Sequence, residues 1–310
     1  MNMKIRAELA FLLFALLIGA RDVGAELIFS NHNKEIRPNF AFLICATITT
    51  LSFLIVVFQR GFRDLIHKFR DRQISYRIML LGASAAVVYL VTFEFIGRYG
   101  AGLFDLFDYG LAPILTAALG ILIFNNLVTR RLYAATIAYL IGVVLLFWGN
   151  QTIGLVWVAI AILSPIGTAV SDAMTKWLLM PDRLTRAELL FVRFLPATIL
   201  VGVWIVGSGG HIHVHEPIKT IPLAVFGGFL PLWLLCTGLG QAALTKYAVW
   251  EFLIPATTFL ATLPWHPQHR TLQKTIGAAF IVSAVISHEI KWFSKSDEAV
   301  EVSEFPGTRD

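Results

Sequence analysis

Seven acidic side chains lie inside long apolar runs of this 310-residue sequence, where water is expected to be scarce. They are Asp22, Glu26, Glu94, Asp105, Asp108, Asp172 and Glu251. Only Arg21 and Arg193 lie deep enough in such runs to oppose them. An ionisable group in these surroundings is costly unless it faces a cavity or a partner, so each one is a candidate functional residue. A crowded carboxyl group can hold a proton or a cation, but not both, and this competition is the chemical basis of coupled exchange.

Spacing along the chain groups four of these acids. Asp22 and Glu26 are four residues apart and share a helix face, with Gly19 one turn before Asp22. Asp105 and Asp108 are three residues apart and also face one way. We therefore expect Asp22, Glu26 and Asp108 to form the outer wall of a central cavity.

The two deep arginines call for carboxylate partners, because a buried charge without a partner is destabilising. We expect Arg193 to pair with Asp172 or Glu251. Glu94 and Arg98 are four residues apart near a helix end, which favours an ordinary salt bridge. A purely structural reading would pair every charge inside the bundle, but seven acids exceed two deep arginines and leave a surplus of carboxyl groups.

The elements that position these residues are predicted to be membrane-spanning helices. Hydrophobic residues make up 57% of the chain and charged residues 15%, and the mean hydropathy is +0.72. A soluble domain has about 25% charged residues, so the composition predicts an all-α, multi-pass integral membrane protein. The runs are too long for barrel strands. A cleaved signal peptide ending near Ala25 is an alternative for the N-terminus, but the apolar run continues beyond it.

Ten apolar windows are long enough to span a bilayer of about 30 Å. We predict spans at about 7–29, 37–58, 78–97, 100–124, 132–149, 154–179, 187–207, 221–242, 244–264 and 272–290. If the N-terminus is cytoplasmic, 17 lysines and arginines fall on the inner side and 6 on the outer side. This asymmetry predicts that both termini are cytoplasmic, including an acidic tail at 291–310. The basic stretch at 59–73 is then a topology signal and not a nucleic-acid site.

The ten spans divide into two halves, 1–151 and 152–290, with similar motifs. "DYGLAPILTAALGIL" in the fourth span matches "WEFLIPATTFLATL" in the ninth, which aligns Pro113 with Pro255. "RRLYAATIAYLIGVV" in the fifth resembles "HRTLQKTIGAAFIVS" in the tenth. Five spans per half would invert the second half relative to the first, and inverted repeats place a binding site near the membrane midplane.

These motifs resemble the drug/metabolite transporter superfamily, EamA-type, over residues 7–290. The resemblance rests on the proline-containing fourth and ninth spans, the small-residue fifth and tenth spans, and Arg193 early in the seventh. It implies a ten-helix bundle in a membrane, such as the bacterial inner membrane, that moves small solutes, most often by efflux. The sequence departs from the family at Ile18-Gly19, where a tryptophan-glycine pair is usual. The loops after spans four and nine also lack the usual glutamate.

The candidate solute- or proton-binding residues follow from depth and spacing. Asp108 precedes Pro113 and Glu251 precedes Pro255, so the repeat maps one acid to each side of the midplane. Tyr109 and Trp250 adjoin these acids and are the aromatic residues expected to contact a solute. The full set is Arg21, Asp22, Glu26, Asp105, Asp108, Tyr109, Asp172, Arg193, Trp250 and Glu251.

The sequence favours a secondary active transporter for a small metabolite, an amino acid or an amine, with protons as a coupling ion. It has no nucleotide-binding loop, HExxH motif or nucleophile elbow, so we expect no enzyme activity and no cofactor. One alternative is a receptor or accessory subunit with the same fold. Another is a divalent-metal transporter that uses His211, His213 and His215 on the outer face, although we expect these histidines to be solvated. The partners expected are the solute, protons and lipid, in a monomer or homodimer.

Overall fold

The computed structural model describes residues 3–30, 36–59, 62–126, 129–147, 154–181, 183–211, 217–265 and 271–289. Every regular element in these ranges is a helix, which confirms the all-α prediction. The first seven helices are α1 (Met3–Ser30), α2 (Ile36–Phe58), α3 (Phe62–Lys68), α4 (Arg72–Tyr99), α5 (Ala101–Phe124), α6 (Arg130–Phe147) and α7 (Leu155–Leu178). They are followed by α8 (Arg186–Gly207), α9 (Pro217–Ala224), α10 (Leu230–Leu239), α11 (Leu244–Glu251), α12 (Leu253–Thr262) and α13 (Leu272–Glu289).

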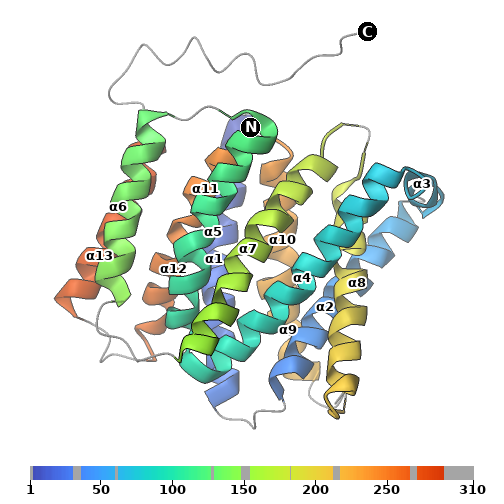
Figure 1. Cartoon of the computed structure of the whole chain (residues 1–310), viewed down its shortest axis with the longest axis horizontal. Coiled ribbons are helices and arrows are strands. Elements are labelled where there is room, and N and C mark those ends of the chain that lie inside the picture. The colour runs from blue at the N-terminus through green and yellow to red at the C-terminus, as the bar shows by residue number, and fades with distance from the viewer. Residues whose placement is uncertain are drawn as a thin grey trace.

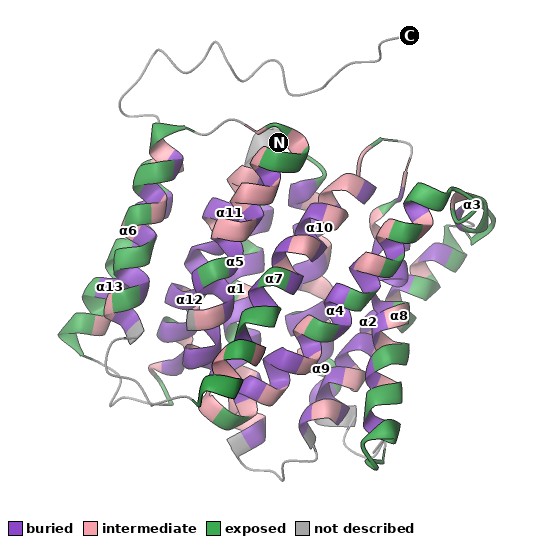
Figure 2. Cartoon of the chain, in the orientation of Figure 1, coloured by how far each residue is buried: buried purple, intermediate pink, exposed green. Residues whose placement is uncertain are grey.

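Six helical segments in the described residues are long and apolar enough to cross a membrane. They are Arg37–Phe58, Arg72–Tyr99, Ala101–Phe124, Leu155–Leu178, Arg186–Gly207 and Thr220–Leu239. The outer faces of α6, α8 and α13 are exposed in Figure 2, and much of this surface consists of large apolar side chains such as Ile137, Val203 and Ile276. An apolar exterior of this kind suits contact with lipid, so the chain has the make-up of a multi-pass membrane protein.

The helices run side by side in a bundle with α6 and α13 at one edge and α2, α3 and α8 at the other (Figure 1). The main packing pairs are α6 with α13, α2 with α8 and α9, α4 with α7 and α8, α5 with α7 and α11, and α1 with α10 and α12. Because α1 also touches α4, α5 and α11, its charged side chains can face protein instead of lipid. The α6–α13 contact is close because Gly142 and Gly277 face each other. A Cβ added at Gly142 would lie 2.8 Å from the Gly277 carbonyl oxygen.

Two prolines interrupt helices near the centre of the bundle. Proline has no backbone N–H, so Pro255 cannot bond the carbonyl of Glu251, and the helix divides into α11 and α12 at Phe252. Pro231 likewise follows η1 (Val225–Phe229), a π-helical turn that joins α9 to α10. Interrupted helices inside a membrane protein are tolerated where they line a cavity or are covered by protein.

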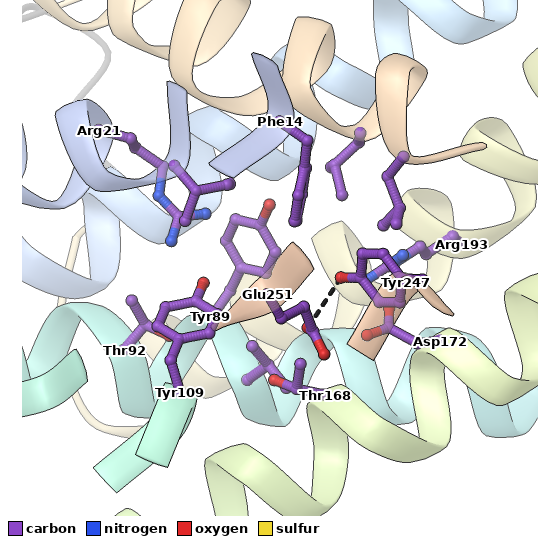
Figure 3. Close-up of a pocket in the computed structure, with 14 residues that line it drawn as sticks. Phe14, Arg21, Tyr89, Thr92, Tyr109, Thr168, Asp172, Arg193, Tyr247 and Glu251 are labelled. Atoms are coloured by element: carbon purple, nitrogen blue, oxygen red, sulfur yellow. Dashed lines mark hydrogen bonds between the residues drawn. The ribbon is translucent and has the colours of Figure 1, made fainter. Parts of the chain in front are cut away.

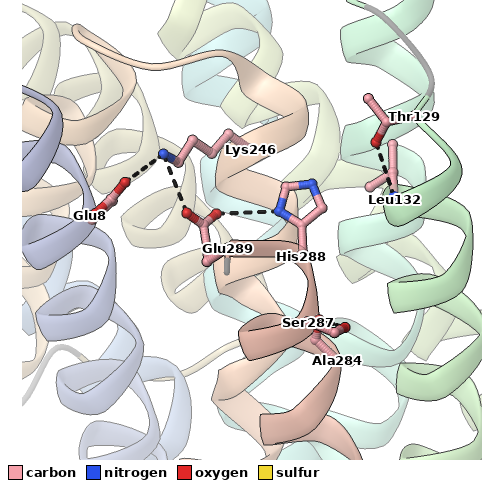
Figure 4. A network of polar contacts seen from close by, with 8 residues as sticks. All are labelled: Glu8, Thr129, Leu132, Lys246, Ala284, Ser287, His288 and Glu289. Carbon is pink, nitrogen blue, oxygen red and sulfur yellow. Dashed lines mark hydrogen bonds and ion pairs between the residues drawn. The ribbon is translucent and has the colours of Figure 1, made fainter. Parts of the chain in front are cut away.

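Ionic contacts tie the helix ends together on the side where α3 and the N-terminus lie (Figure 1). Lys246 on α11 contacts Glu8 on α1 at 2.8 Å and Glu289 on α13 at 3.4 Å (Figure 4). Lys68 on α3 contacts Glu188 on α8 at 2.9 Å. The lysines of these pairs are partly exposed, which weakens each contact, but together the pairs connect α1, α3, α8, α11 and α13.

The ends of the helices lie within a few residues of most predicted boundaries, although six of the described segments, and not ten, qualify as membrane spans. The largest difference is at the start of α4. Helix α4 begins at Arg72 and not near residue 78. The side chain of Asp71 caps this end by accepting a hydrogen bond from the Gln73 N–H at 2.7 Å. The first turns of α4 are polar, so a hydropathy window does not include them although they belong to the helix.

Candidate functional site

A cavity of about 40 Å³ lies between α1, α4, α5, α7, α8, α10 and α11 (Figure 3). Its polar lining residues are Arg21, Tyr89, Thr92, Tyr109, Thr168, Asp172, Arg193, Tyr247 and Glu251. Its apolar lining residues are Phe14, Ile18, Val88, Leu232 and Leu235. A buried water needs about 10–15 Å³, so the cavity has room for roughly three waters in this conformation.

One end of the cavity gathers Asp172, Arg193, Tyr247 and Glu251, as Figure 3 shows. The Tyr247 hydroxyl donates a hydrogen bond to Glu251 Oε1 at 2.8 Å. Arg193 Nη1 donates to the Thr175 hydroxyl at 3.5 Å. Three further polar atoms of these residues, namely Asp172 Oδ2, Arg193 Nε and Glu251 Oε2, are buried without a hydrogen-bond partner. Positive and negative groups with unused bonding capacity therefore line the same cavity.

The predicted ion pair of Arg193 with Asp172 or Glu251 is not formed. Within the described part of the chain, no carboxylate lies within ion-pair distance of the Arg193 guanidinium. Tyr247 and Thr175 hold Glu251 and Arg193 through hydrogen bonds instead. The three charged residues face the same cavity, which is a different arrangement from a closed structural pair.

Arg21 and Asp22 form the one direct ion pair found at the centre of the described structure. Arg21 Nε and Nη2 both lie 2.7 Å from Asp22 Oδ1, and Asp22 is completely buried. The Arg21 guanidinium also lies 5.9 Å from the centre of the Tyr89 ring. A Cβ at Gly227 in η1 would lie 2.8 Å from the Arg21 Cβ, so glycine is needed there for Arg21 to pack. Adjacent residues on a helix point about 100° apart, and therefore the sequence did not indicate this pair.

Asp105 and Asp108 lie close to Asp22 but do not line the cavity. Asp108 is 1% exposed, and its Oδ1 accepts a hydrogen bond from the cavity-lining Thr168 hydroxyl at 3.3 Å. Asp105 is fully buried, and neither of its oxygens has a hydrogen-bond partner. The structure thus brings Asp22, Asp105 and Asp108 together behind the cavity lining, which corrects the predicted place of Asp22 and Asp108 in the cavity wall.

Glu26 lies elsewhere, which corrects its predicted place in the cavity wall. Its Oε2 accepts a hydrogen bond from the Ala101 N–H, the first residue of α5, at 3.0 Å. A carboxylate is favourable there because the first N–H groups of a helix have no partner within the helix. Gly100 precedes this end with φ 87°, and a Cβ there would lie 3.0 Å from Glu26 Oε1. Glu26 therefore caps α5.

Of the two aromatic candidates, Tyr109 lines the cavity and Trp250 does not. Trp250 packs against the apolar core, and its Nε1 is buried without a partner. Sequence reasoning missed Tyr89 and Tyr247. Tyr247 precedes Glu251 by one helical turn, and this i, i+4 spacing was a usable signal. The predicted Glu94–Arg98 salt bridge is confirmed at 3.2 Å.

The outer-face histidines give no metal site in the described residues. His213 and His215 lie outside those residues, whereas His211 is exposed and its carbonyl accepts a hydrogen bond from Asn39 Nδ2 at 3.1 Å. Among the residues that the structure describes, no group of three or more His, Cys, Asp or Glu side chains could hold a metal ion.

Comparison with known proteins supports the fold and is silent on function. The sequence matches no protein-family model and no curated protein. The fold is similar to a solved structure titled "Crystal structure of protein", with a TM-score of 0.69. That similarity covers 90% of this chain and 95% of the other chain at 12% sequence identity. At this identity the likeness concerns the fold alone.

Proposed function

We propose that the protein is a secondary active transporter that carries a small zwitterionic or cationic solute across a membrane by alternating access. The observation that carries this proposal is the cavity that Arg193, Asp172 and Glu251 line together, each of which also has a buried polar atom without a hydrogen-bond partner. Leaving such groups unsatisfied in an apolar bundle is destabilising, so a bound partner is expected to satisfy them.

The cavity chemistry favours a solute that carries both charges, such as an amino acid. A guanidinium recognises a carboxylate through paired N–H donors, and Arg193 has no carboxylate partner of its own. Asp172 and Glu251 can accept hydrogen bonds from an ammonium group. Phe14, Leu232 and Leu235 offer contact to an apolar side chain.

The size of the cavity supports movement between conformations. About 40 Å³ is too small for a solute larger than a few waters. In a transporter this conformation would be an occluded state between openings to the two faces. Solute entry then requires helices to separate on one side at a time.

The packing pattern supports ten spanning helices in two inverted halves, 1–151 and 152–290. In this arrangement α1, α6, α11–α12 and α13 also cross the membrane. Exchanging the halves turns the α4–α7 contact into α10–α1, α5–α7 into α12–α1, and α4–α8 into α9–α2. The pairs α6–α13, α2–α8 and α5–α11 are exchanged with themselves. Such pairwise equivalence is expected when two repeats are related by a two-fold axis in the membrane plane.

The charge distribution supports a cytoplasmic location for the helix ends that lie beside α3. The resemblance to EamA-type transporters favours a bacterial inner membrane and an efflux direction. With this orientation both termini are cytoplasmic, and Lys68 and Lys246 lie on the inner side.

Ligand-dependent stabilisation of the purified protein tests the proposal. We would measure its melting temperature with amino acids, amines, nucleosides and divalent metal ions, and then assay counterflow of any stabilising solute in proteoliposomes. We expect an amino acid or amine to stabilise the protein and to exchange across the bilayer. Arg193→Gln should remove the stabilisation, whereas the matched variant Arg98→Gln at a partly exposed helix end should keep it.

Three results would count against the proposal. Stabilisation without counterflow would favour a receptor or accessory subunit. Stabilisation by divalent metal ions alone, lost on replacement of His211, would favour metal transport. An unchanged response in Arg193→Gln would show that the cavity does not bind the solute.

A further inference from the structure

Asp105 on α5 is unusual among the buried acids because neither of its carboxyl oxygens makes a hydrogen bond of normal geometry or an ion pair with a described residue. It is fully buried, both carboxyl oxygens lack a hydrogen-bond partner, and it does not line the cavity. Asp22 has Arg21 at 2.7 Å, and Glu251 has the Tyr247 hydroxyl at 2.8 Å. An ionised carboxylate without a cation or a donor in an apolar interior is strongly unfavourable, whereas a carboxylic acid is tolerated.

The groups around Asp105 strengthen this contrast. Its charged neighbours are Asp22 and Arg21 on α1 and Asp108 on α5. Arg21, the one cation among them, already forms an ion pair with Asp22. Tyr109 on α5 and Tyr139 on α6 are the neighbouring phenols, and Glu251 on α11 lies beyond Tyr139. A second carboxylate next to Asp22 and Asp108 would add a like charge to a layer that holds one arginine.

Two buried hydroxyl groups next to the acids also lack partners. Thr258 on α12 lies beside Asp105, and Ser164 on α7 lies beside Asp108. Both are at least 99% buried, and neither hydroxyl oxygen has a hydrogen-bond partner. Gly19 lets α12 approach here, because a Cβ at that position would lie 2.8 Å from the Thr258 nitrogen. These hydroxyls are free to bond a carboxyl group that gains or loses a proton.

A path of polar groups connects Asp105 with the cavity. Thr168 lines the cavity and donates to Asp108 Oδ1 at 3.3 Å. Asp108 follows Asp105 by three residues and therefore shares its helix face. We infer that Asp105 is a proton-binding site, separate from the solute cavity and reached from it through Asp108. In the forward step a hydronium ion in the cavity gives its proton, by way of the Asp108 carboxylate, to the Asp105 carboxylate. Asp105 becomes a neutral carboxylic acid and a water is left in the cavity, and the reverse step returns the proton to that water.

The inference rests on the proposed function only where it concerns coupling. It assigns the solute to Arg193, Asp172 and Glu251 and the proton to Asp105, so the two ligands do not compete for one carboxylate. Binding of the proton changes the charge of the Arg21–Asp22–Asp105–Asp108 layer by one unit. Such a change can bias the bundle toward one of two conformations without direct contact with the solute.

Infrared spectroscopy of the purified protein in lipid nanodiscs tests the proton site without any solute. We would record the carbonyl stretch of protonated carboxyl groups between about pH 5 and pH 9. This range lies above the ordinary pKa of a carboxyl group, which is about 4. We expect a band that persists above neutrality in the wild type. The band should lose the Asp105 component in Asp105→Asn and be unchanged in Glu94→Gln, a control acid paired with Arg98 at a helix end.

A band that is unchanged in Asp105→Asn would overturn the inference. Loss of the wild-type band when sodium replaces potassium at constant pH would also overturn it, because the site would then bind sodium. If Asp105→Asn does not fold, Asp105→Glu serves instead, since a glutamic acid at this position should shift the band and not remove it. An unshifted band in that variant would contradict the assignment.

Transport in proteoliposomes tests the coupling role. The probe is a mixture of ¹⁴C-labelled amino acids, assayed by counterflow and by accumulation against a pH gradient. In Asp105→Asn we expect accumulation to fall to the level without a gradient and counterflow to lose its pH dependence, while Glu94→Gln behaves as the wild type. Gradient-driven accumulation that persists in Asp105→Asn would overturn the inference. Absence of wild-type counterflow would defeat the proposed function, and the infrared result would still decide the proton site.

Discussion

The Arg21–Asp22 ion pair predicts a large and specific stability effect. Asp22 is completely buried, Arg21 is 6% exposed, and two guanidinium nitrogens lie 2.7 Å from one carboxylate oxygen. Asp22→Asn keeps the shape and removes the charge, so Arg21 is left as a buried cation. Breaking a buried pair by removing one partner costs about 3–5 kcal/mol, and we expect the free energy of unfolding to fall by that amount.

Asp105→Asn is the matched control because it changes the same residue type in the same polar layer. Asp105 has no ion pair, so its replacement strands no cation, and we expect a change of less than about 1 kcal/mol. Replacing both partners in Arg21→Met/Asp22→Asn should recover most of the loss, because the buried cation is then absent. The difference between the double variant and the sum of the single variants measures the coupling energy.

Reversible unfolding in mixed detergent micelles, followed by the circular dichroism of the helices, gives the five free energies needed: the wild type, Asp22→Asn, Arg21→Met, the double variant and the Asp105→Asn control. The reasoning fails if Asp22→Asn is within about 1 kcal/mol of the wild type. Asp105 or Asp108 would then act as the partner of Arg21, or the guanidinium would reach water. A large loss has a practical consequence: a transport defect in Asp22→Asn would combine folding with coupling, so Asp108→Asn is the cleaner test of this charge layer.

Three further predictions concern the framework around the site. Glu26→Ala should lower the free energy of unfolding by about 1 kcal/mol through loss of the α5 cap, and Glu26→Gln by less, as measured in the same assay. Gly277→Leu should cost about 1–3 kcal/mol because any side chain there collides with the α6 backbone, and a neutral result would refute the close packing. Arg63→Cys should react with a membrane-impermeant maleimide only from the cytoplasmic side and Ser208→Cys only from the outside. Both native cysteines are fully buried, so the background should be low, and the reverse labelling would invert the topology.

Helix positions could be predicted closely because bilayer thickness dictates the length of an apolar run. The windows at 37–58 and 187–207 differ from α2 and α8 by one residue at most. The start of α4 could not be predicted, because it depends on the Asp71 cap and not on hydropathy. The span predicted at 244–264 is divided at Phe252 because Pro255 lacks a backbone N–H. The position of Glu251 at the cavity depends on how α11 packs, which the sequence does not reveal.

The sequence predicted which residues line the cavity better than it predicted which residues they contact. Arg21, Tyr109, Asp172, Arg193 and Glu251 do line the cavity. Which acid meets which donor depends on the rotation of each helix about its axis, and spacing within one helix carries no information on this. Glu26 illustrates the limit, since its partner is the first N–H of a helix 75 residues further along the chain.

The charge balance at the centre of the bundle connects stability with the proposed function. Five acids, namely Asp22, Asp105, Asp108, Asp172 and Glu251, are at least 98% buried there, and Arg21 and Arg193 are the two arginines that accompany them. Full ionisation would leave three negative charges in excess in an apolar environment, which several kcal/mol of desolvation per charge makes unfavourable. The core must therefore take up protons or a cationic group. Under the proposed function, the charge that enters must also be able to leave, and the same surplus that destabilises an empty core would favour the replacement of one bound cation or proton by another.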